Sequence, residues 1–135
     1  MYTHETKIRV RYNETDQMGY VHNGNYAIYY DMARTEMLRS LDMTYVQMEE
    51  SGIMMPLLEL HCKFIRPALY DQELTIRTVV NDLPGTRITF NYEIFNEDGV
   101  LINIGSTILV FFDMARKKPC QPPGYFMEKI AQYFT

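Results

Sequence analysis

The sequence predicts an α+β fold in which one antiparallel sheet wraps around one long helix. Residues 25–40 carry a helical pattern, and segments with alternating apolar residues precede and follow it. Turns rich in asparagine, aspartate and glycine join the later segments, and strands joined by tight turns are antiparallel. The first half of the helix is apolar almost all round, so it must be enclosed by the sheet.

The bulk composition is that of one globular domain covering residues 1–135. The chain has 135 residues, with 47% hydrophobic and 22% charged side chains. A net charge of -4 argues against a nucleic-acid partner, whose phosphates require a basic face. The N-terminus has no signal-peptide pattern, and no apolar run is long enough to span a membrane. Two isolated cysteines favour a reduced, cytoplasmic setting, and three scattered histidines give no metal-ligand spacing.

The first part of the chain reads as strand, loop, helix and short helix. Alternation over residues 7–12 predicts a half-buried strand, and residues 13–24 form a polar loop. The long helix covers residues 25–40, where Glu36 and Arg39 can pair across one turn. A short second helix is expected over residues 44–51, ended by Gly52.

The rest of the chain reads as consecutive strands and a terminal helix. Strands are expected over residues 54–64, 73–80, 88–95 and 101–112, and the last of these is apolar enough for both faces to be covered. A basic, proline-containing tail and a short amphipathic helix near residues 127–134 follow. An exposed sheet edge is a pairing hazard, so we expect a homodimer joined edge to edge.

The loop before the long helix is the candidate for chemistry. Asp16 precedes the helix by a few residues, and Gly19 and Gly24 allow the backbone to approach a substrate closely. Unpaired N–H groups at a helix start can bind the oxyanion of an attacked carbonyl. A nearby carboxylate can act as nucleophile or as general base for water, and the sequence leaves both roles open.

These residues carry a resemblance to a known family. The pattern Asp16-x-x-Gly19-x-Val21-x-Asn23-x-x-Tyr26, followed by Ala-Arg-Thr-Glu-Met-Leu-Arg over residues 33–39, resembles hot-dog-fold acyl-CoA thioesterases of the 4-hydroxybenzoyl-CoA thioesterase type. The Tol-Pal-associated branch is the most similar. The resemblance implies that Asp16 is catalytic and that the oxyanion hole is the backbone N–H at Asn23. It also implies a dimer, or a dimer of dimers, with active sites at the dimer interface.

The resemblance leaves the substrate open. His22-Asn23 is closer to the Val-x-Asn variant of fatty acyl thioesterases than to the Tol-Pal-associated branch, so the acyl group is not assigned. His22 can contact a ligand, or it can be a helix-entry histidine hydrogen-bonded to the backbone. Thr15 and Asn23 are candidate helix caps, and Asp16 itself can be a turn residue. Gly19 and Tyr26 are further candidates for substrate contact, and Tyr26 can equally be a core residue.

Coenzyme A is anionic, so its phosphates require arginine or lysine at the surface. The candidates follow a turn and the last strand; they are Arg87, Arg116, Lys117 and Lys118. Each can also be a solvated basic tip. No cofactor is expected, because coenzyme A is part of the substrate.

The predicted reaction is hydrolysis of an acyl-CoA thioester to a free acid and coenzyme A. Three alternatives remain: an acyl-acyl carrier protein thioesterase, a related hydratase or dehydratase, and a non-catalytic acyl-CoA-binding protein. A hydratase would need a catalytic histidine paired with a carboxylate, and His22 is the only candidate, at an unsuitable spacing from Asp16. A Gly-x-Ser-x-Gly nucleophile motif is lacking, which argues against an α/β-hydrolase.

Overall fold

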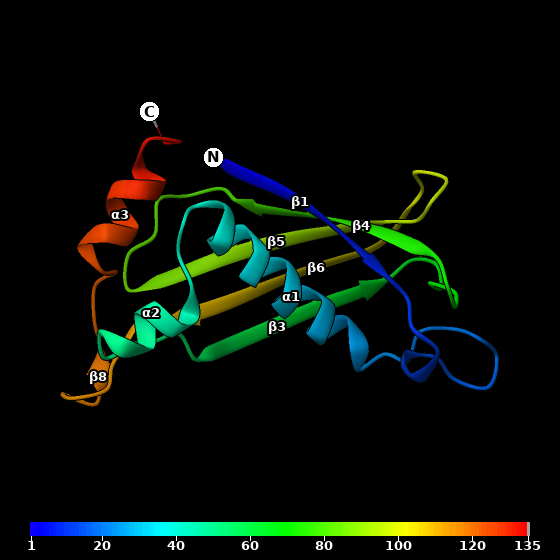
Figure 1. The fold of residues 1–135 in the computed structure, drawn as a ribbon, viewed down its shortest axis with the longest axis horizontal. Coiled ribbons are helices and arrows are strands. Elements are labelled where there is room, and N and C mark those ends of the chain that lie inside the picture. The colour runs from blue at the N-terminus through cyan, green and yellow to red at the C-terminus, as the bar shows by residue number, and fades with distance from the viewer. Residues whose placement is uncertain (135) are drawn as a thin grey trace.

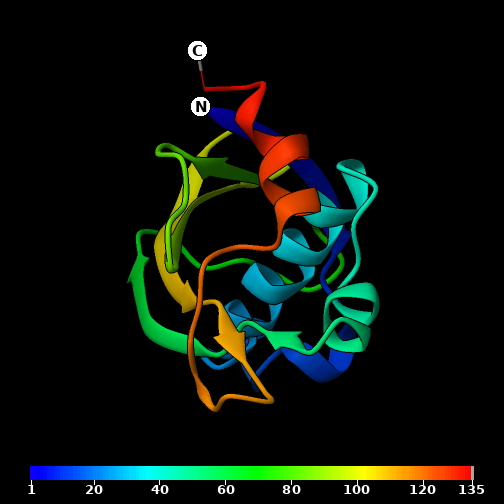
Figure 2. The ribbon, with the colours of Figure 1, turned by 90° about the vertical axis from the view of Figure 1, so that its left-hand side faces the viewer.

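The computed structural model describes residues 1–134 and has one five-stranded antiparallel sheet, in the order β1-β4-β5-β6-β3. Its strands are β1 (Tyr2–Arg9), β3 (Leu57–Phe64), β4 (Glu73–Val80), β5 (Arg87–Phe95) and β6 (Leu101–Val110). The long helix α1 (Asn25–Ser40) lies across one face of this sheet (Figure 1). In the view along the sheet, the strands curve around α1 (Figure 2). The predicted arrangement of one sheet wrapped around one helix is confirmed.

Smaller elements lie at the ends of the sheet. They are η1 (Tyr12–Glu14), α2 (Tyr45–Glu50), β2 (Ile53–Met54), β7 (Phe112–Asp113), β8 (Lys118–Pro119) and α3 (Gly124–Ala131). Strands β2, β7 and β8 form a second, three-stranded sheet. The basic stretch expected as a tail is therefore a short hairpin, in which Asp113 pairs with Lys118.

The long helix and the strand over residues 73–80 have the predicted bounds, but the first strand does not. β1 begins at Tyr2 and ends at Arg9, because it pairs with β4 along its whole length, from Tyr2 opposite Val80 to Arg9 opposite Glu73. The polar residues of its first half give no sign of this pairing. The predicted strand over residues 54–64 is divided in two around Pro56, whose ring nitrogen cannot donate to a ladder.

The core lies between α1 and the inner face of the sheet. Tyr26, Tyr29, Tyr30, Ala33 and Met37 are buried on this side of α1. The Tyr30 ring stacks on Tyr92 of β5, with ring centroids 4.3 Å apart. This close approach requires Gly105 on β6, because a Cβ there would lie 2.1 Å from Tyr30 Oη.

The core also contains a paired cation. Arg34 of α1 is buried and donates to the hydroxyls of Tyr92 at 3.1 Å and Tyr45 at 3.4 Å, and to Asp31 Oδ1 at 2.9 Å. The Tyr92 hydroxyl lies 2.6 Å from that of Thr107 on β6. These bonds tie the helix to the centre of the sheet through groups that would otherwise be buried without partners.

Within one chain, the outer face of the sheet over residues 101–112 is less covered than the sequence predicted. Ile104, on the outer face of β6, is 39% exposed, so the expectation that both faces of residues 101–112 are covered is wrong. The buried residues of β6 are mainly those that face α1, because α1 covers only one face of the sheet. None of the helices over residues 1–134 is long and apolar enough to cross a membrane.

Candidate active site

The loop between η1 and α1 is held in place by backbone pairing at both ends. Thr15 bridges to Val21, and Tyr20 bridges to Leu69 in the segment after β3. Val21 N–H donates to Ala68 O at 2.9 Å, which docks the loop on that segment. The loop is therefore a fixed hairpin-like turn that leads directly into α1.

Asp16 lies at the start of this turn and shapes it. Its Oδ1 accepts bonds from the backbone N–H groups of Met18 at 2.8 Å and Tyr20 at 3.1 Å. Gly19 has φ +77°, a conformation that strains other residues, and its N–H donates to Asp16 O at 3.0 Å. The two bonds to Oδ1 fix the carboxylate, while Oδ2 receives no hydrogen bond from residues 1–134.

Asn23 provides the second chemical group, a free backbone donor. The helix begins at Asn25 with Gly24 as its N-cap, and none of the hydrogen bonds among the described residues uses the Asn23 N–H. Gly24 N–H is occupied, because it donates to His22 Nδ1 at 3.1 Å. The prediction that Thr15 or Asn23 caps the helix is wrong: the cap makes no side-chain bond, and Thr15 Oγ1 donates to Tyr12 O instead.

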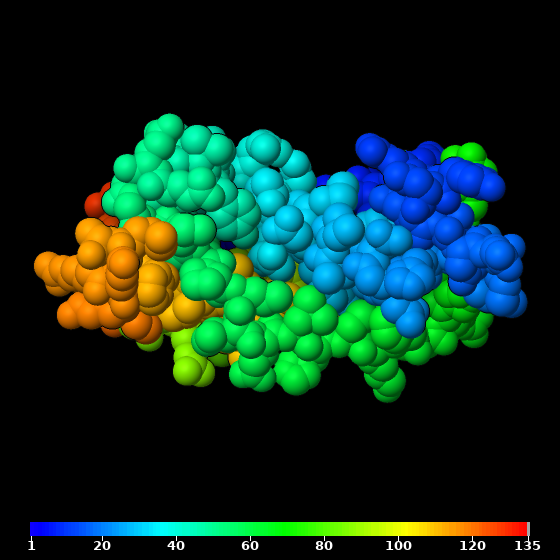
Figure 3. All heavy atoms as spheres, turned by 90° about the horizontal axis from the view of Figure 1, so that it is seen from below, coloured from blue at the N-terminus to red at the C-terminus, as the bar shows by residue number. Residues whose placement is uncertain are grey.

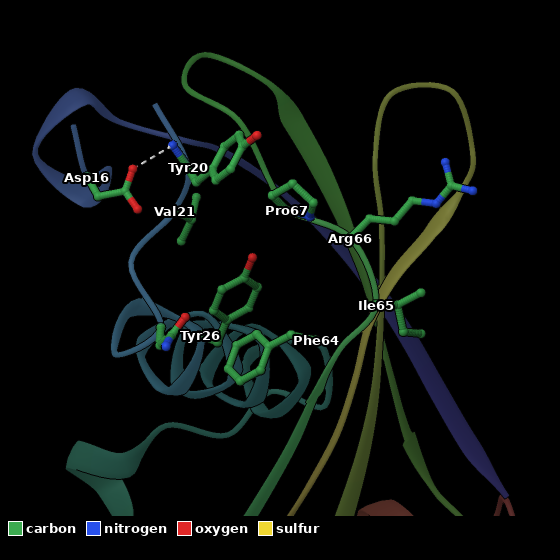
Figure 4. A pocket seen from close by; sticks show the side chains of 9 residues that line it. Asp16, Tyr20, Val21, Tyr26, Phe64, Ile65, Arg66 and Pro67 are labelled. Atoms are coloured by element: carbon green, nitrogen blue, oxygen red, sulfur yellow. Dashed lines mark hydrogen bonds between the residues drawn. The ribbon is translucent and has the colours of Figure 1, made fainter. Parts of the chain in front are cut away.

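Asp16 and Asn23 line the same cavity, which has a volume of about 320 Å³. Tyr20, Val21 and Tyr26 form its walls on the loop and helix side. The opposite wall is the end of β3 and the residues after it, Phe64, Ile65, Arg66 and Pro67. In Figure 4 the side chains of Asp16, Val21, Tyr26, Phe64 and Pro67 surround the cavity, whereas Arg66 points away from it. The sequence does not predict that Phe64–Pro67 line the cavity. Its one signal there is Pro67, which marks the point where the chain leaves the sheet.

Tyr26 and Phe64 make the inner part of the cavity aromatic. Their rings meet edge to face, with centroids 5.1 Å apart. Burial raises the pKa of Tyr26, so its hydroxyl remains protonated at neutral pH. A carboxylate and an unpaired amide at the rim of an apolar cavity form an arrangement that can bind and attack a carbonyl group.

Comparison with known proteins assigns the family. Residues 10–130 match the model of the thioesterase-like superfamily. The chain belongs to this superfamily. It is 30% identical to YneP of Bacillus subtilis over 121 residues, which cover 90% of this chain and 88% of YneP. It is 28% identical to the acyl-CoA thioester hydrolase YbgC of Escherichia coli over 125 residues, 93% of each chain.

The solved structures give the same fold. A DHNA-CoA thioesterase of Staphylococcus aureus superposes with a TM-score of 0.89 and 34% identity, covering 98% of this chain and 89% of that one. The predicted hot-dog fold and thioesterase family are thereby confirmed.

In this thioesterase-like chain, two candidate residues near Asp16 lie outside the cavity lining. His22 is exposed, and its ring accepts the bond from Gly24, the arrangement of a helix-entry histidine. Gly19 shapes the Asp16 turn instead of lining the cavity.

The candidate cations lie far from Asp16 within one chain. Arg87 begins β5 and lines a separate 140 Å³ cavity with the β4–β5 turn. Arg116, Lys117 and Lys118 lie on the β7–β8 hairpin, at the end of the molecule opposite the Asp16 loop (Figure 1). Arg116 pairs with Asp113 at 3.9 Å, and all three side chains are exposed. Within a single chain, the structure does not bring these cations to the cavity.

Proposed function

We propose that this thioesterase hydrolyses acyl-CoA with Asp16 as its catalytic carboxylate and the Asn23 N–H as its oxyanion donor. Thioester hydrolysis is the activity of its family and of the relatives that it matches. One observation supports the residue roles most strongly. The Asp16 carboxylate and the unbonded Asn23 N–H line one cavity, with aromatic side chains beside them.

The reaction follows from this arrangement. The thioester carbonyl oxygen accepts a bond from Asn23 N–H, which stabilises the charge that develops on attack. In one route Asp16 Oδ2 attacks the carbonyl carbon, the C–S bond breaks, and water hydrolyses the resulting anhydride. In the other route Asp16 takes a proton from water, the hydroxide attacks, and the proton passes to the departing thiolate. The thiolate is a good leaving group, so neither route requires a strong general acid.

A single-turnover reaction in H₂¹⁸O tests for direct attack. If Asp16 attacks and water then opens the anhydride at the aspartyl carbonyl, the first molecule of acid carries oxygen from Asp16, and ¹⁸O enters the protein. If Asp16 activates water, or if water opens the anhydride at the acyl carbonyl, the first molecule of acid carries ¹⁸O. Mass spectrometry of the protein after one turnover therefore assigns direct attack when ¹⁸O is found in Asp16.

The activity itself is tested by thiol release from a panel of acyl-CoA and acyl-acyl carrier protein thioesters of differing chain length and aromaticity. We expect release from at least one acyl-CoA well above the uncatalysed rate. Release only from the carrier protein would move the proposal to that substrate. No release from any thioester would favour a non-catalytic acyl-CoA-binding protein.

The working unit that we propose is a single-domain cytoplasmic protein that forms homodimers, and the dimers can pair further. The exposed apolar edge at β3 supports the dimer, and two free thiols, Cys62 and Cys120, accord with a reducing compartment. No cofactor is required, because coenzyme A enters as part of the substrate. Light scattering of the purified protein tests the oligomeric state.

A further inference from the structure

Glu14 lies two residues before Asp16 and connects the Asp16 loop to the beginning of α1. Its backbone carbonyl accepts two bonds, from His22 N–H at 2.9 Å and from the side-chain amide of Asn25 at 2.8 Å. These two donors lie on either side of Asn23, whose N–H is the proposed oxyanion donor. One carbonyl oxygen therefore joins the segment that carries the carboxylate to the segment that carries the donor.

The Glu14 side chain makes a second connection to the same helix. Its Oε1 accepts bonds from the Tyr29 hydroxyl at 3.0 Å and from Arg11 N–H at 2.8 Å. Tyr29 is fully buried one helical turn after Asn25, so the core fixes its position. Burial and the bond to Glu14 raise the pKa of Tyr29, so its hydroxyl stays protonated and donates to the carboxylate. In Figure 3 the segment before the helix, in blue, lies against the first turns of α1, in lighter blue.

We propose that Glu14 and Asn25 are positioning residues, which hold the catalytic carboxylate and the oxyanion donor at the separation that attack on a thioester requires. Neither residue lines the cavity, so each acts through the backbone that it holds. The loop also docks on the segment after β3 through Val21 N–H, but that bond fixes it against the sheet and not against α1. A displacement of about 1 Å between reacting groups can lower a rate about 100-fold. This inference rests on the proposed thioesterase function.

Two single variants each remove one connection. Asn25→Ala loses the 2.8 Å bond to Glu14 O, and alanine favours a helix, so α1 itself should be retained. Tyr29→Phe loses only the hydroxyl and keeps the buried ring. We expect each variant to lower kcat about 10-fold or more while KM stays within about twofold of the wild type, because the reacting groups are displaced and the cavity lining is kept.

Matched controls remove hydrogen bonds of the same kind away from the loop. Thr35→Ala loses a 2.9 Å bond to Asp31 O within α1. Tyr2→Phe loses a 2.6 Å bond to Ser40 at the other end of the helix. Both controls should keep kcat within about twofold of the wild type, even where their Tm falls as far as that of the loop variants. This comparison separates positioning from a general loss of stability.

A double-mutant cycle tests whether Tyr29 acts through Glu14. Glu14→Ala removes the carboxylate that accepts from Tyr29 and keeps the backbone carbonyl that accepts from Asn25. Adding Tyr29→Phe to Glu14→Ala should therefore lower kcat little further, whereas adding Asn25→Ala should lower it about 10-fold again. Independent, multiplicative losses from Glu14→Ala and Tyr29→Phe would contradict action through one shared bond.

Amide hydrogen exchange gives a measurement that does not depend on activity. The His22 N–H bonds the same carbonyl as Asn25, so it should exchange about tenfold faster in Asn25→Ala, because the loop opens from the helix more often. The two controls should leave this exchange rate unchanged. Unchanged exchange in Asn25→Ala would overturn the inference, whether or not the protein hydrolyses thioesters.

The kinetic outcomes separate this inference from the proposed function. A wild-type protein that releases no thiol, or an Asp16→Asn protein that stays fully active, would end the proposed function itself. A wild type that requires Asp16, together with Asn25→Ala and Tyr29→Phe proteins whose kcat stays within about twofold of it, would overturn only the positioning role.

Discussion

Replacing Gly105 by alanine should weaken the packing of α1 against the sheet. An added Cβ would lie 2.1 Å from Tyr30 Oη, 2.4 Å from Cζ and 2.5 Å from Cε2. The Tyr30 ring cannot move away freely, because it stacks on Tyr92 at 4.3 Å and its hydroxyl donates to Asn103. Tyr30 lies one helical turn after Tyr26, so the same contact supports the helix beside the cavity.

The cost follows from two contributions. Ordinary contact begins near 3.4 Å, so ring and strand must separate by roughly 1.3 Å, and such overpacking costs about 1–3 kcal/mol. The shift also breaks the Tyr30–Asn103 bond and leaves buried polar groups unpaired, at about 1–3 kcal/mol. We expect a loss of about 2–6 kcal/mol in the free energy of unfolding, or a fall of roughly 8–24 °C in Tm at about 4 °C per kcal/mol for a chain of this size.

Urea unfolding followed by circular dichroism measures this loss. Gly85→Ala is the matched control, because an added Cβ at Gly85 would meet no neighbouring atom of residues 1–134 within 4 Å and its φ is not positive. The stability of this control should change by less than about 1 kcal/mol. A Gly105→Ala protein within about 0.5 kcal/mol of the wild type, the usual scatter of surface substitutions, would refute the predicted contact between helix and sheet.

Two further predictions concern the buried polar groups. Arg34→Lys should lower the free energy of unfolding by about 1–3 kcal/mol in a urea titration. The three guanidinium nitrogens of Arg34 bond separately to Tyr45, Tyr92 and Asp31, and the single nitrogen of a lysine cannot reach all three positions. Equal stability of the two proteins would refute this role of the guanidinium group. Burial raises the pKa of Tyr92 to about 12, so the stability that its neutral form contributes is present below pH 10 and is lost as the pH rises through 12. In a phenolate absorbance titration of the native protein, five of the eleven tyrosines should resist ionisation near pH 10: Tyr26, Tyr29, Tyr30, Tyr45 and Tyr92. Ionisation of all eleven near pH 10, without unfolding, would contradict this.

Local patterns in the sequence predict much of the fold. The helix over residues 25–40 is predictable because its apolar residues recur at helical spacing, and the strand over residues 73–80 because it alternates cleanly. The bounds of β1 are not predictable, since its first half is polar and becomes a strand only by pairing with β4. The sequence predicts a tail where the β7–β8 hairpin lies, because pairing between two-residue strands leaves no periodic pattern.

In the candidate site, too, the residues close together in sequence were predictable and those brought together by folding were not. Asp16, Asn23 and Tyr26 are close in sequence, and they line one cavity as adjacent parts of a loop and helix. The facing wall, Phe64–Pro67, is some forty residues further along the chain, and only the docking of the loop on Ala68 brings it near. As coenzyme A contacts, Arg87 and the basic hairpin are predicted from charge alone, and charge does not fix position: within one chain both lie away from the Asp16 cavity.

The most direct test of the catalytic role of Asp16 is the kcat/KM of Asp16→Asn with the best thioester of the panel. Asparagine keeps the size of the side chain and the acceptor for Met18 and Tyr20, so Tm should change little. We expect kcat/KM to fall about 100-fold or more. The control Asp98→Asn, in the β5–β6 turn, should leave kcat/KM unchanged. An Asp16→Asn enzyme that stays within about twofold of the wild-type kcat/KM would contradict the central claim.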